Sequence, residues 1–194
     1  MSRIIEAPQG SDEWLQARCG VITASNFATA IGSGKTMQSY MYKLAAERIT
    51  GEVAEMYKND AMQRGNDLEP VACKEYEFEH NTTVQETSLW LLDDDIGASP
   101  DRLIGDDGLL EIKCPLAHTH VGYLDKLKLP SIYKAQVQGQ MWVTDRQWCD
   151  FVSYHPDMKS MTIRVLRDDD YIKELSDKIN EFKIKLIKLV ERIQ

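Results

Sequence analysis

The chain has 194 residues, of which 43% are hydrophobic and 28% are charged, a composition typical of a globular protein with a substantial core. It contains no apolar run of about 18 residues, so no membrane span is predicted. The net charge of −8 argues against a nucleic-acid-binding module that relies on a broad basic face. The N-terminal segment lacks the apolar core of a secretion signal, and the four cysteines form no CxxC pair, so an intracellular protein with reduced thiols is expected.

Helices are predicted for much of the first 80 residues. The segment 11–18 begins with a serine that can cap a helix and places acids in the first turn. A second, short helix is predicted to begin at Ser25 as N-cap and to end at Gly32 as C-cap. Apolar residues at three- and four-residue spacings predict two longer helices over 38–50 and 59–79.

After residue 82 the sequence consists mainly of short segments typical of β-strands, interrupted by one predicted helix over 131–144. The predicted strands cover 83–92, 96–105, 109–115, 148–155 and 161–167. Helices before and after a small central sheet define a mixed α/β fold. The chain shows no repeat, low-complexity tract or Pro/Ser-rich linker, so residues 1–194 are expected to form a single domain.

The C-terminal segment 170–194 carries a regular apolar pattern that predicts a long helix. Its spacings alternate between three and four residues, as in a heptad seam. The seam consists of Ile172, Leu175, Ile179, Phe182, Leu186, Leu189 and Ile193. Such a helix can pack on its own domain or form a subunit contact, and the sequence leaves both alternatives open.

The segment around residue 105 combines acidic residues, a lysine and a tight turn. Alternation along the strand 109–113 places Glu111 and Lys113 on one face. The turn Gly105-Asp106-Asp107-Gly108 folds this strand back toward Asp101, which can then lie beside Glu111. Two neighbouring carboxylates repel each other and are typical ligands of Mg²⁺. Lys113 is placed to orient or deprotonate the attacking water or to stabilise the transition state.

The spacing Pro100-Asp101, nine residues, Glu111-Ile112-Lys113 is the PD-(D/E)xK arrangement of metal-dependent nucleases. The alternative is a surface hairpin with a salt bridge between Glu111 and Lys113. Apolar residues on both sides of the strand favour the nuclease interpretation. Glu69, on the helix predicted upstream, could supply a third carboxylate, although an acid on a helix is more often exposed to solvent.

Five segments in a fixed order extend the similarity well beyond this pattern. They are GVITAS (20–25), RGNDLEP (64–70), SPD (99–101), LEIKCP (110–115) and AQVQGQMWV (135–143). Together they resemble the YqaJ/lambda-exonuclease family of viral recombinases. The resemblance implies a restriction-endonuclease-like core and a Mg²⁺-dependent, processive 5′→3′ exonuclease that acts on double-stranded DNA.

The resemblance also implies roles for particular residues. Those similar to the family's metal ligands are Glu69, Asp101, Glu111 and the main-chain carbonyl of Ile112. Lys113 is similar to its catalytic lysine, and Gln136 to a glutamine beside the catalytic centre. Arg18, Ser25 and Ser99 are similar to residues that hold the terminal 5′-phosphate, and Lys35 to a DNA contact at the channel entrance.

Assembly and partners are likewise implied by the resemblance. It implies two Mg²⁺ ions, with Mn²⁺ expected to substitute, and a homotrimeric ring that encloses the duplex. Enclosure would let an acidic protein hold DNA, because basic contacts need only line the channel. A phage single-strand annealing protein is the expected partner, and the bacterial cytoplasm the expected location.

Other interpretations of the sequence were weighed against the nuclease. The segment GSGKT (32–36), with the acidic strand LWLLDDD (89–95), has the ending of a phosphate-binding loop, but the glycine required at position 29 is Thr29. His118 and His120 could be taken for a metal pair, but two histidines without a third ligand are more often surface residues. An endonuclease or repair nuclease with the same core, or a DNA-binding module without catalysis, are further alternatives.

Overall fold

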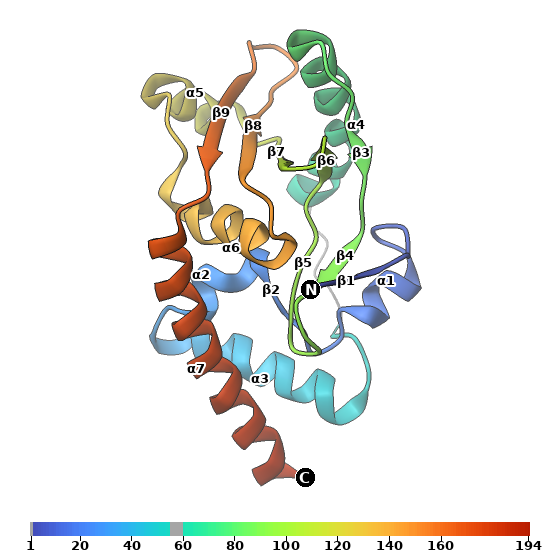
Figure 1. The fold of residues 1–194 in the computed structure, drawn as a ribbon, viewed down its shortest axis with the longest axis vertical. Coiled ribbons are helices and arrows are strands. Elements are labelled where there is room, and N and C mark those ends of the chain that lie inside the picture. The colour runs from blue at the N-terminus through green and yellow to red at the C-terminus, as the bar shows by residue number, and fades with distance from the viewer. Residues whose placement is uncertain (1, 55–59) are drawn as a thin grey trace.

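Two mixed sheets form the framework of the computed structural model, which describes residues 2–54 and 60–194 (Figure 1). The first has the order β1-β4-β5-β2, with β1 at Arg3–Ile5, β4 at Leu89–Leu91, β5 at Ile96–Ala98 and β2 at Ile22–Thr23. The second has the order β3-β6-β7-β8-β9, with β3 at Gln85–Glu86, β6 at Arg102–Ile104, β7 at Gly108–Lys113, β8 at Trp148–Ser153 and β9 at Met161–Leu166. The pairs β2–β5 and β7–β8 run parallel, and the other neighbours run antiparallel.

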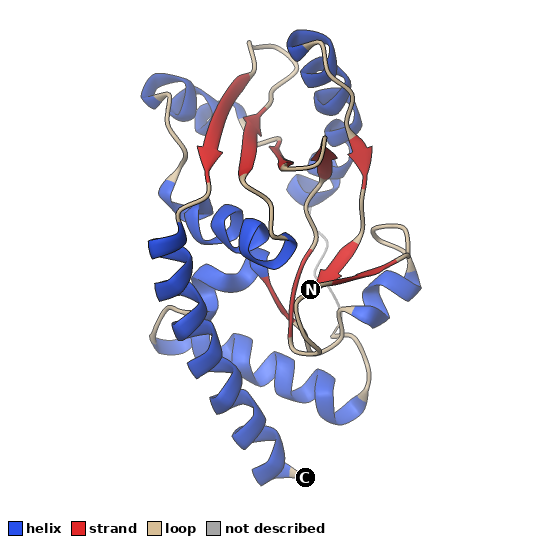
Figure 2. Ribbon diagram, in the orientation of Figure 1, coloured by secondary structure: helices blue, strands red, loops and turns tan. Residues whose placement is uncertain are grey.

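Helices surround these sheets, as Figure 2 shows by colour. The α-helices are α1 (Asp12–Ala17), α2 (Phe27–Ala30), α3 (Gly34–Thr50), α4 (Asp60–His80), α5 (Ala117–Lys126), α6 (Lys134–Thr144) and α7 (Asp169–Ile193). Short 3₁₀ helices precede two of them, η1 (Ala24–Asn26) before α2 and η2 (Ser131–Tyr133) before α6. In the part of the chain that the structure describes, no helix is both long enough and apolar enough to cross a bilayer. The predicted mixed α/β class is confirmed.

Two predicted strands are each divided between the two sheets. The segment 83–92 becomes β3 and β4, and the segment 96–105 becomes β5 and β6. The second break falls at Ser99-Pro100-Asp101, where Pro100 has no N–H group to continue a ladder. The break turns the chain from one sheet into the other and leaves the Asp101 side chain beside β7. The strands β1 and β2 and the helix α5 were not predicted.

Several helix boundaries also differ from the prediction. Ser25 lies within η1 and is not an N-cap, because Thr23 is the residue that precedes the first helical turn. The helix α2 ends one residue early, with Ile31 as its C-cap in place of Gly32. The helix α3 begins at Gly34, earlier than predicted, and α4 continues to His80. Residue 59, the predicted start of α4, lies outside the described residues.

The two faces of β7 pack against different helices. Leu109 lies in a core with Met141 of α6, whereas Leu110 and Ile112 lie in a core with Ala72 of α4. Strand alternation therefore directs Glu111, between Leu110 and Ile112, to the α6 side. The active-site candidates thus lie where a buried parallel strand meets α6 on one face and the N-terminal half of α4 is close by.

The C-terminal helix packs against the chain's own core. Its N-cap is Asp168, whose side chain accepts a hydrogen bond from the Tyr171 N–H at 3.0 Å. The residues of the heptad seam from Leu175 to Leu189 are buried in a cluster with Phe27 and Leu44. Ile172 is also buried, while Ile193 at the end is exposed. These side chains are already covered within one chain, so the structure favours the first of the two alternatives for the seam.

Candidate active site

The β6–β7 hairpin has the predicted geometry. Its register pairs Ile104 with Gly108, and Gly105 takes a positive φ of 52° in the turn. Gly108 is required by packing, because a Cβ atom there would lie within 2.3 Å of the Trp148 ring. The Arg146 guanidinium donates hydrogen bonds to the carbonyls of Gly105 and Gly108 at 2.9 and 2.8 Å. The turn is therefore held both by the packing of Gly108 against Trp148 and by the hydrogen bonds from Arg146.

Asp101 lies directly beside β7, as the hairpin predicted. Pairing of β6 with β7 ends at Leu110, so the N–H of Ile112 is not used by the β6 backbone. Asp101 Oδ2 accepts this hydrogen bond at 2.6 Å. One backbone contact thereby fixes the carboxylate next to Glu111, and the Ile112 carbonyl lies on the same short segment.

Glu111 is the most deeply buried acid of the site, with 1% of its surface exposed. Its Oε1 accepts a hydrogen bond from Gln136 at 2.6 Å and contacts the ammonium of Lys113. Its Oε2 accepts a hydrogen bond from Gln140 at 2.7 Å. Both glutamines lie on α6, four residues apart and so on one helix face. The sequence analysis missed Gln140, although that spacing from Gln136 could have identified it.

Burial and neighbouring carboxylates shift the pKa values of Asp101 and Lys113. Burial raises the pKa of the Asp101 carboxyl well above its usual value, and the Glu111 carboxylate raises it further. Burial alone would lower the pKa of Lys113, but the carboxylates of Glu111 and Asp101 outweigh this effect and raise it above the usual value. Lys113 is therefore held as a cation. This favours orienting and charge-stabilising roles over deprotonation of water.

Glu69 reaches the site from α4 and pairs with a residue that the sequence analysis did not single out. Arg102, directly after Asp101 in the chain, lies 3.1 Å from Glu69 and donates a hydrogen bond to the Asp101 carbonyl at 2.5 Å. Glu69, Asp101, Ile112 and Lys113 all line one cleft of about 570 Å³. The predicted metal ligands Glu69, Asp101 and Ile112 are therefore brought together, with Glu111 behind them.

A divalent cation would have to compete for these oxygens. Within the described residues, no three His, Cys, Asp or Glu side chains are already spaced as a metal site. The reason is visible in the contacts: Arg102 pairs with Glu69, and Lys113 and two amides bind the Glu111 oxygens. The hard oxygen donors nevertheless fit Mg²⁺, and the pKa of Asp101 is raised by burial and by the negative charge of Glu111.

The predicted phosphate-binding residues lie around the end of β2. The Arg18 guanidinium stacks over the Trp14 ring at 4.1 Å and lies 3.4 Å from Thr23 Oγ1, which in turn lies 3.2 Å from Ser25 Oγ. Burial lowers the pKa of Arg18. Among the described residues, the buried Arg18 Nε has no hydrogen-bond partner. Thr23, which joins Arg18 to Ser25, was missed by the sequence analysis.

Ser99 approaches this group from the neighbouring strand. The parallel register of β2 and β5 pairs Thr23 with Gly97, so Ser25 and Ser99 follow the paired residues by the same two positions. Ser99 Oγ is also buried, and no described residue forms a hydrogen bond with it. The geometry thus places a cation and two hydroxyls near the ends of adjacent strands, with unused hydrogen-bonding capacity.

Lys35, His118 and His120 were also considered from the sequence, and they lie outside the catalytic cleft. Lys35 is exposed in the first turn of α3 and lines a different groove, with residues of α7. His118 is exposed, but His120 is fully buried, contrary to the expectation for both histidines. His120 bonds to Ser153 Oγ at 2.7 Å and to the Lys159 carbonyl at 3.0 Å, which gives it a structural role. The segment 32–36 joins α2 to α3 and does not follow a strand, unlike a phosphate-binding loop.

The fold and the placement of Asp101, Glu111 and Lys113 define a nuclease of the PD-(D/E)xK class. Residues 13–147 match the YqaJ-like viral recombinase domain, and the chain belongs to this family. It is also similar to the alkaline exonuclease of Laribacter hongkongensis, with 40% identity and a TM-score of 0.88 over 94% of this chain and 96% of that one. A structure of that exonuclease in complex with dAMP matches at 39% identity, with the same TM-score and coverage.

Two more distant similarities concern the fold and the sequence alone. A phage-related exonuclease from Haemophilus somnus shares the fold, with 19% identity and a TM-score of 0.73 over 90% of this chain and 96% of that one. An uncharacterized protein of Acanthamoeba polyphaga mimivirus is 28% identical over 169 residues, which cover 78% of this chain. The chain spans only 30% of the length of that viral protein.

Proposed function

We propose that the protein is a Mg²⁺-dependent, processive 5′→3′ exonuclease that degrades one strand of double-stranded DNA and releases 5′-mononucleotides. The observation that carries this proposal is the cleft in which Glu69, Asp101 and Lys113 meet in front of the buried Glu111. The dAMP complex of the Laribacter exonuclease supports a mononucleotide product. We also propose that residues 1–194 act as one nuclease domain.

The residues proposed to hold two Mg²⁺ ions, or Mn²⁺ in their place, are Glu69, Asp101, Glu111 and the Ile112 carbonyl. When bound, the ions would supply Lewis-acid stabilisation of the phosphate and the leaving oxygen. Gln136 and Gln140 keep the Glu111 carboxylate oriented by hydrogen bonds of 2.6 and 2.7 Å. Asp101 is held by the Ile112 N–H, so its second oxygen remains available to the cleft.

Lys113 is proposed as the catalytic cation. Its ammonium contacts Glu111 in the structure, and it would give up this contact when the carboxylate ligates a metal ion. The freed ammonium lies in the cleft, where it can orient the attacking water and donate to the phosphoryl oxygens as negative charge develops. Tyr133, whose ring centroid lies 5.5 Å from Lys113 Nζ, limits the positions that the lysine can take.

The polarity is proposed to arise from recognition of the terminal 5′-phosphate by Arg18, Ser25 and Ser99. Arginine binds phosphate through charge-assisted hydrogen bonds, and the unpartnered Arg18 Nε and Ser99 Oγ fit an anionic ligand. Lys35 is proposed as a further DNA contact, away from the catalytic cleft. A homotrimeric ring around the duplex and a single-strand annealing protein as partner complete the proposal. Light scattering would measure the mass of the assembly.

Replacement of Arg18 by alanine tests the phosphate recognition. Each lost charge-assisted hydrogen bond is worth roughly 1.5–3 kcal/mol, so we expect digestion of 5′-phosphorylated duplex to slow at least about tenfold. A 5′-hydroxyl duplex should be a similarly poor substrate for the unmodified protein. Arg18→Ala should lose most of the preference for phosphate over hydroxyl, because both changes remove the same contact. Slow digestion of both ends with the preference retained would show that Arg18 does not bind the phosphate.

A further inference from the structure

A basic groove lies apart from the catalytic cleft, between α3 and the C-terminal half of α7. These helices pack side by side at the lower end of the molecule in Figure 1, below β7 and α4. The groove has a volume of about 650 Å³, and four cations line it: Lys35, Lys185, Lys188 and Arg192. None of the described residues that line it is acidic. This concentration of positive charge stands out in a chain whose net charge is −8.

Among the described residues, the four cations differ from their neighbours in having no acidic partner. Elsewhere on α7, Lys173 pairs with Asp177 at 3.1 Å and Lys183 pairs with Asp93 at 2.7 Å. Within the described part of the chain, none of the groove cations forms an ion pair. The helix dipole accounts for Arg192 in the last turn of α7, but not for Lys185 or for Lys35 at the start of α3. Like charges at this spacing repel, so the groove is suited to bind a polyanion.

The floor of the groove is apolar and includes an exposed aromatic ring. Met37, Met41 and Leu189 line it between the cations. Tyr42 is 54% exposed, and a hydrogen bond of 2.8 Å from Gln38 to its hydroxyl holds the ring in place. A duplex presents sugars and phosphates to such a floor and keeps its bases stacked inside. A single strand exposes bases that can lie on aromatic and apolar side chains while basic residues contact its phosphates.

We propose that this groove binds single-stranded DNA, with Lys185, Lys188 and Arg192 on the phosphates and Tyr42 against a base. The proposal rests on the proposed exonuclease function for its ligand, because the single strand that would bind is the one that digestion of the duplex leaves intact. Binding there would hold that strand away from the catalytic cleft and keep the enzyme on its substrate.

The test is the affinity for a fluorescent oligothymidylate with a 5′-hydroxyl, measured by anisotropy in EDTA at several salt concentrations. The double variant Lys185→Gln/Lys188→Gln should bind at least tenfold more weakly at low salt. Each phosphate contact contributes roughly 0.7 to the salt slope on single strands, so loss of two contacts should reduce the slope by about 1.4. Tyr42→Ala should weaken binding without changing the slope, because the ring carries no charge.

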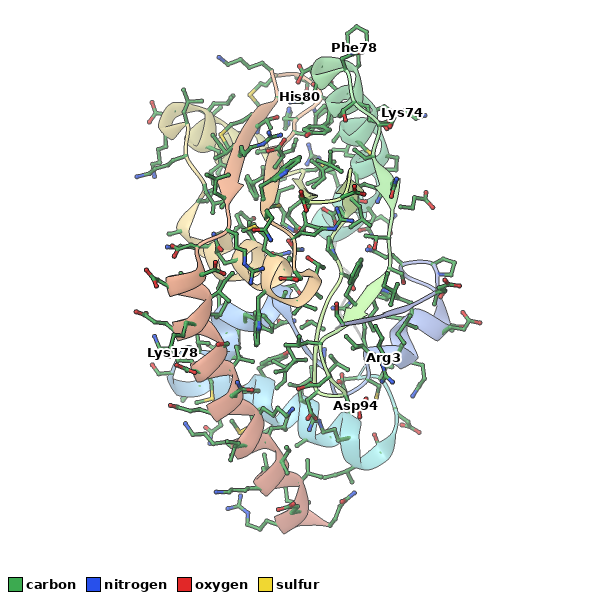
Figure 3. The ribbon with its side chains drawn as sticks, in the orientation of Figure 1. Arg3, Lys74, Phe78, His80, Asp94 and Lys178 are labelled. Atoms are coloured by element: carbon green, nitrogen blue, oxygen red, sulfur yellow. The ribbon has the colours of Figure 1, made fainter. Side chains whose placement is uncertain are left out.

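The matched control is Lys74→Gln/Lys178→Gln, which removes the same charge from two exposed lysines outside the groove, both labelled in Figure 3. Wild-type affinity and slope are expected for this control. Groove variants that bind the oligonucleotide like the control would overturn the proposal. An acidic protein segment would then be the alternative ligand of the groove. An equal loss of affinity for a duplex of the same length, with no effect of Tyr42→Ala, would overturn the assignment to single strands.

This measurement requires no hydrolysis, so its outcome is separate from that of the proposed function. If the wild-type protein had no exonuclease activity, the proposed function would be contradicted. The oligonucleotide affinity could still be measured and would still test the groove. If both proposals hold, the control Lys74→Gln/Lys178→Gln should digest short duplexes at the wild-type rate, because it leaves both the catalytic cleft and the groove unchanged.

Discussion

At the residue scale, the site is organised around one buried carboxylate. Glu111 receives hydrogen bonds from Gln136 and Gln140 and contacts Lys113, so two amides and one cation stabilise a charge that has almost no access to water. Among the described residues, the Asp101 carboxylate accepts a hydrogen bond only from the Ile112 N–H, and burial and the nearby Glu111 raise its pKa. The two acids therefore respond differently to pH and to cations.

Lys113→Ala should abolish cleavage while leaving the binding of Mg²⁺ and DNA largely intact. The lysine acts on the water and the transition state, whereas the carboxylates hold the ions, and loss of such a group costs at least about 100-fold in rate. Calorimetric titration with Mg²⁺ and a gel-based cleavage assay would measure the two effects separately. Asp101→Ala is the matched comparison, and it should weaken Mg²⁺ binding itself. Loss of Mg²⁺ binding in Lys113→Ala would show that the proposed role of the lysine is wrong.

The raised pKa of Asp101 predicts how stability depends on pH. The folded protein binds the Asp101 proton more tightly than the unfolded chain, so metal-free stability falls as pH rises from the usual aspartate value through the raised one. Mg²⁺ should offset this loss, most strongly at the higher pH, because ionised carboxylates bind it best. Melting temperatures with and without Mg²⁺ across this pH range would measure the effect. Asp101→Asn should flatten both dependences, and an unchanged profile in this variant would contradict the account.

At the element scale, local signals predicted the hairpin and the C-terminal helix but not the division into two sheets. The glycines and aspartates at 105–108 favour one kind of turn, and the heptad seam has a clear period. By contrast, Pro100 interrupts the strand character of the segment 96–105, but nothing local shows that the chain passes from one sheet to the other there. The contacts of Arg102 with Glu69 and of Arg18 with Thr23 depend on that tertiary arrangement, so the sequence alone could not supply them.

Phe182→Asp tests the packing of α7. Phe182 is 3% exposed and its ring stacks on Tyr40 at 5.7 Å, so a buried, unpaired carboxylate should unfold the protein. Circular dichroism and analytical ultracentrifugation would show loss of structure without a stable smaller species. Ile184→Asp is the control on the same helix, because Ile184 is 52% exposed and its replacement should leave the fold intact. A folded monomer of Phe182→Asp would instead place this seam at a subunit interface.

At the scale of the whole molecule, an acidic chain must hold a polyanion. Its cations are not spread over one face: Arg18 lies half-buried beside β2, Lys113 lies in the catalytic cleft, and a third set lines the groove between α3 and α7. The proposed function uses the first two for the strand that is cut, and the proposed single-strand groove would hold the strand that is spared. A ring of subunits would add enclosure to these local contacts, so a net charge of −8 need not prevent DNA binding.

The most direct test of the central claim is digestion of a linear duplex that carries different labels at its 5′ and 3′ ends. We expect immediate release of the 5′ label as a mononucleotide and survival of a 3′-terminal single strand. Mg²⁺ should be required, EDTA should stop the reaction, and a covalently closed circle should remain intact. Release of the 3′ label first, or cleavage of the closed circle, would contradict the proposed 5′→3′ exonuclease while leaving the assignment to the nuclease family in place.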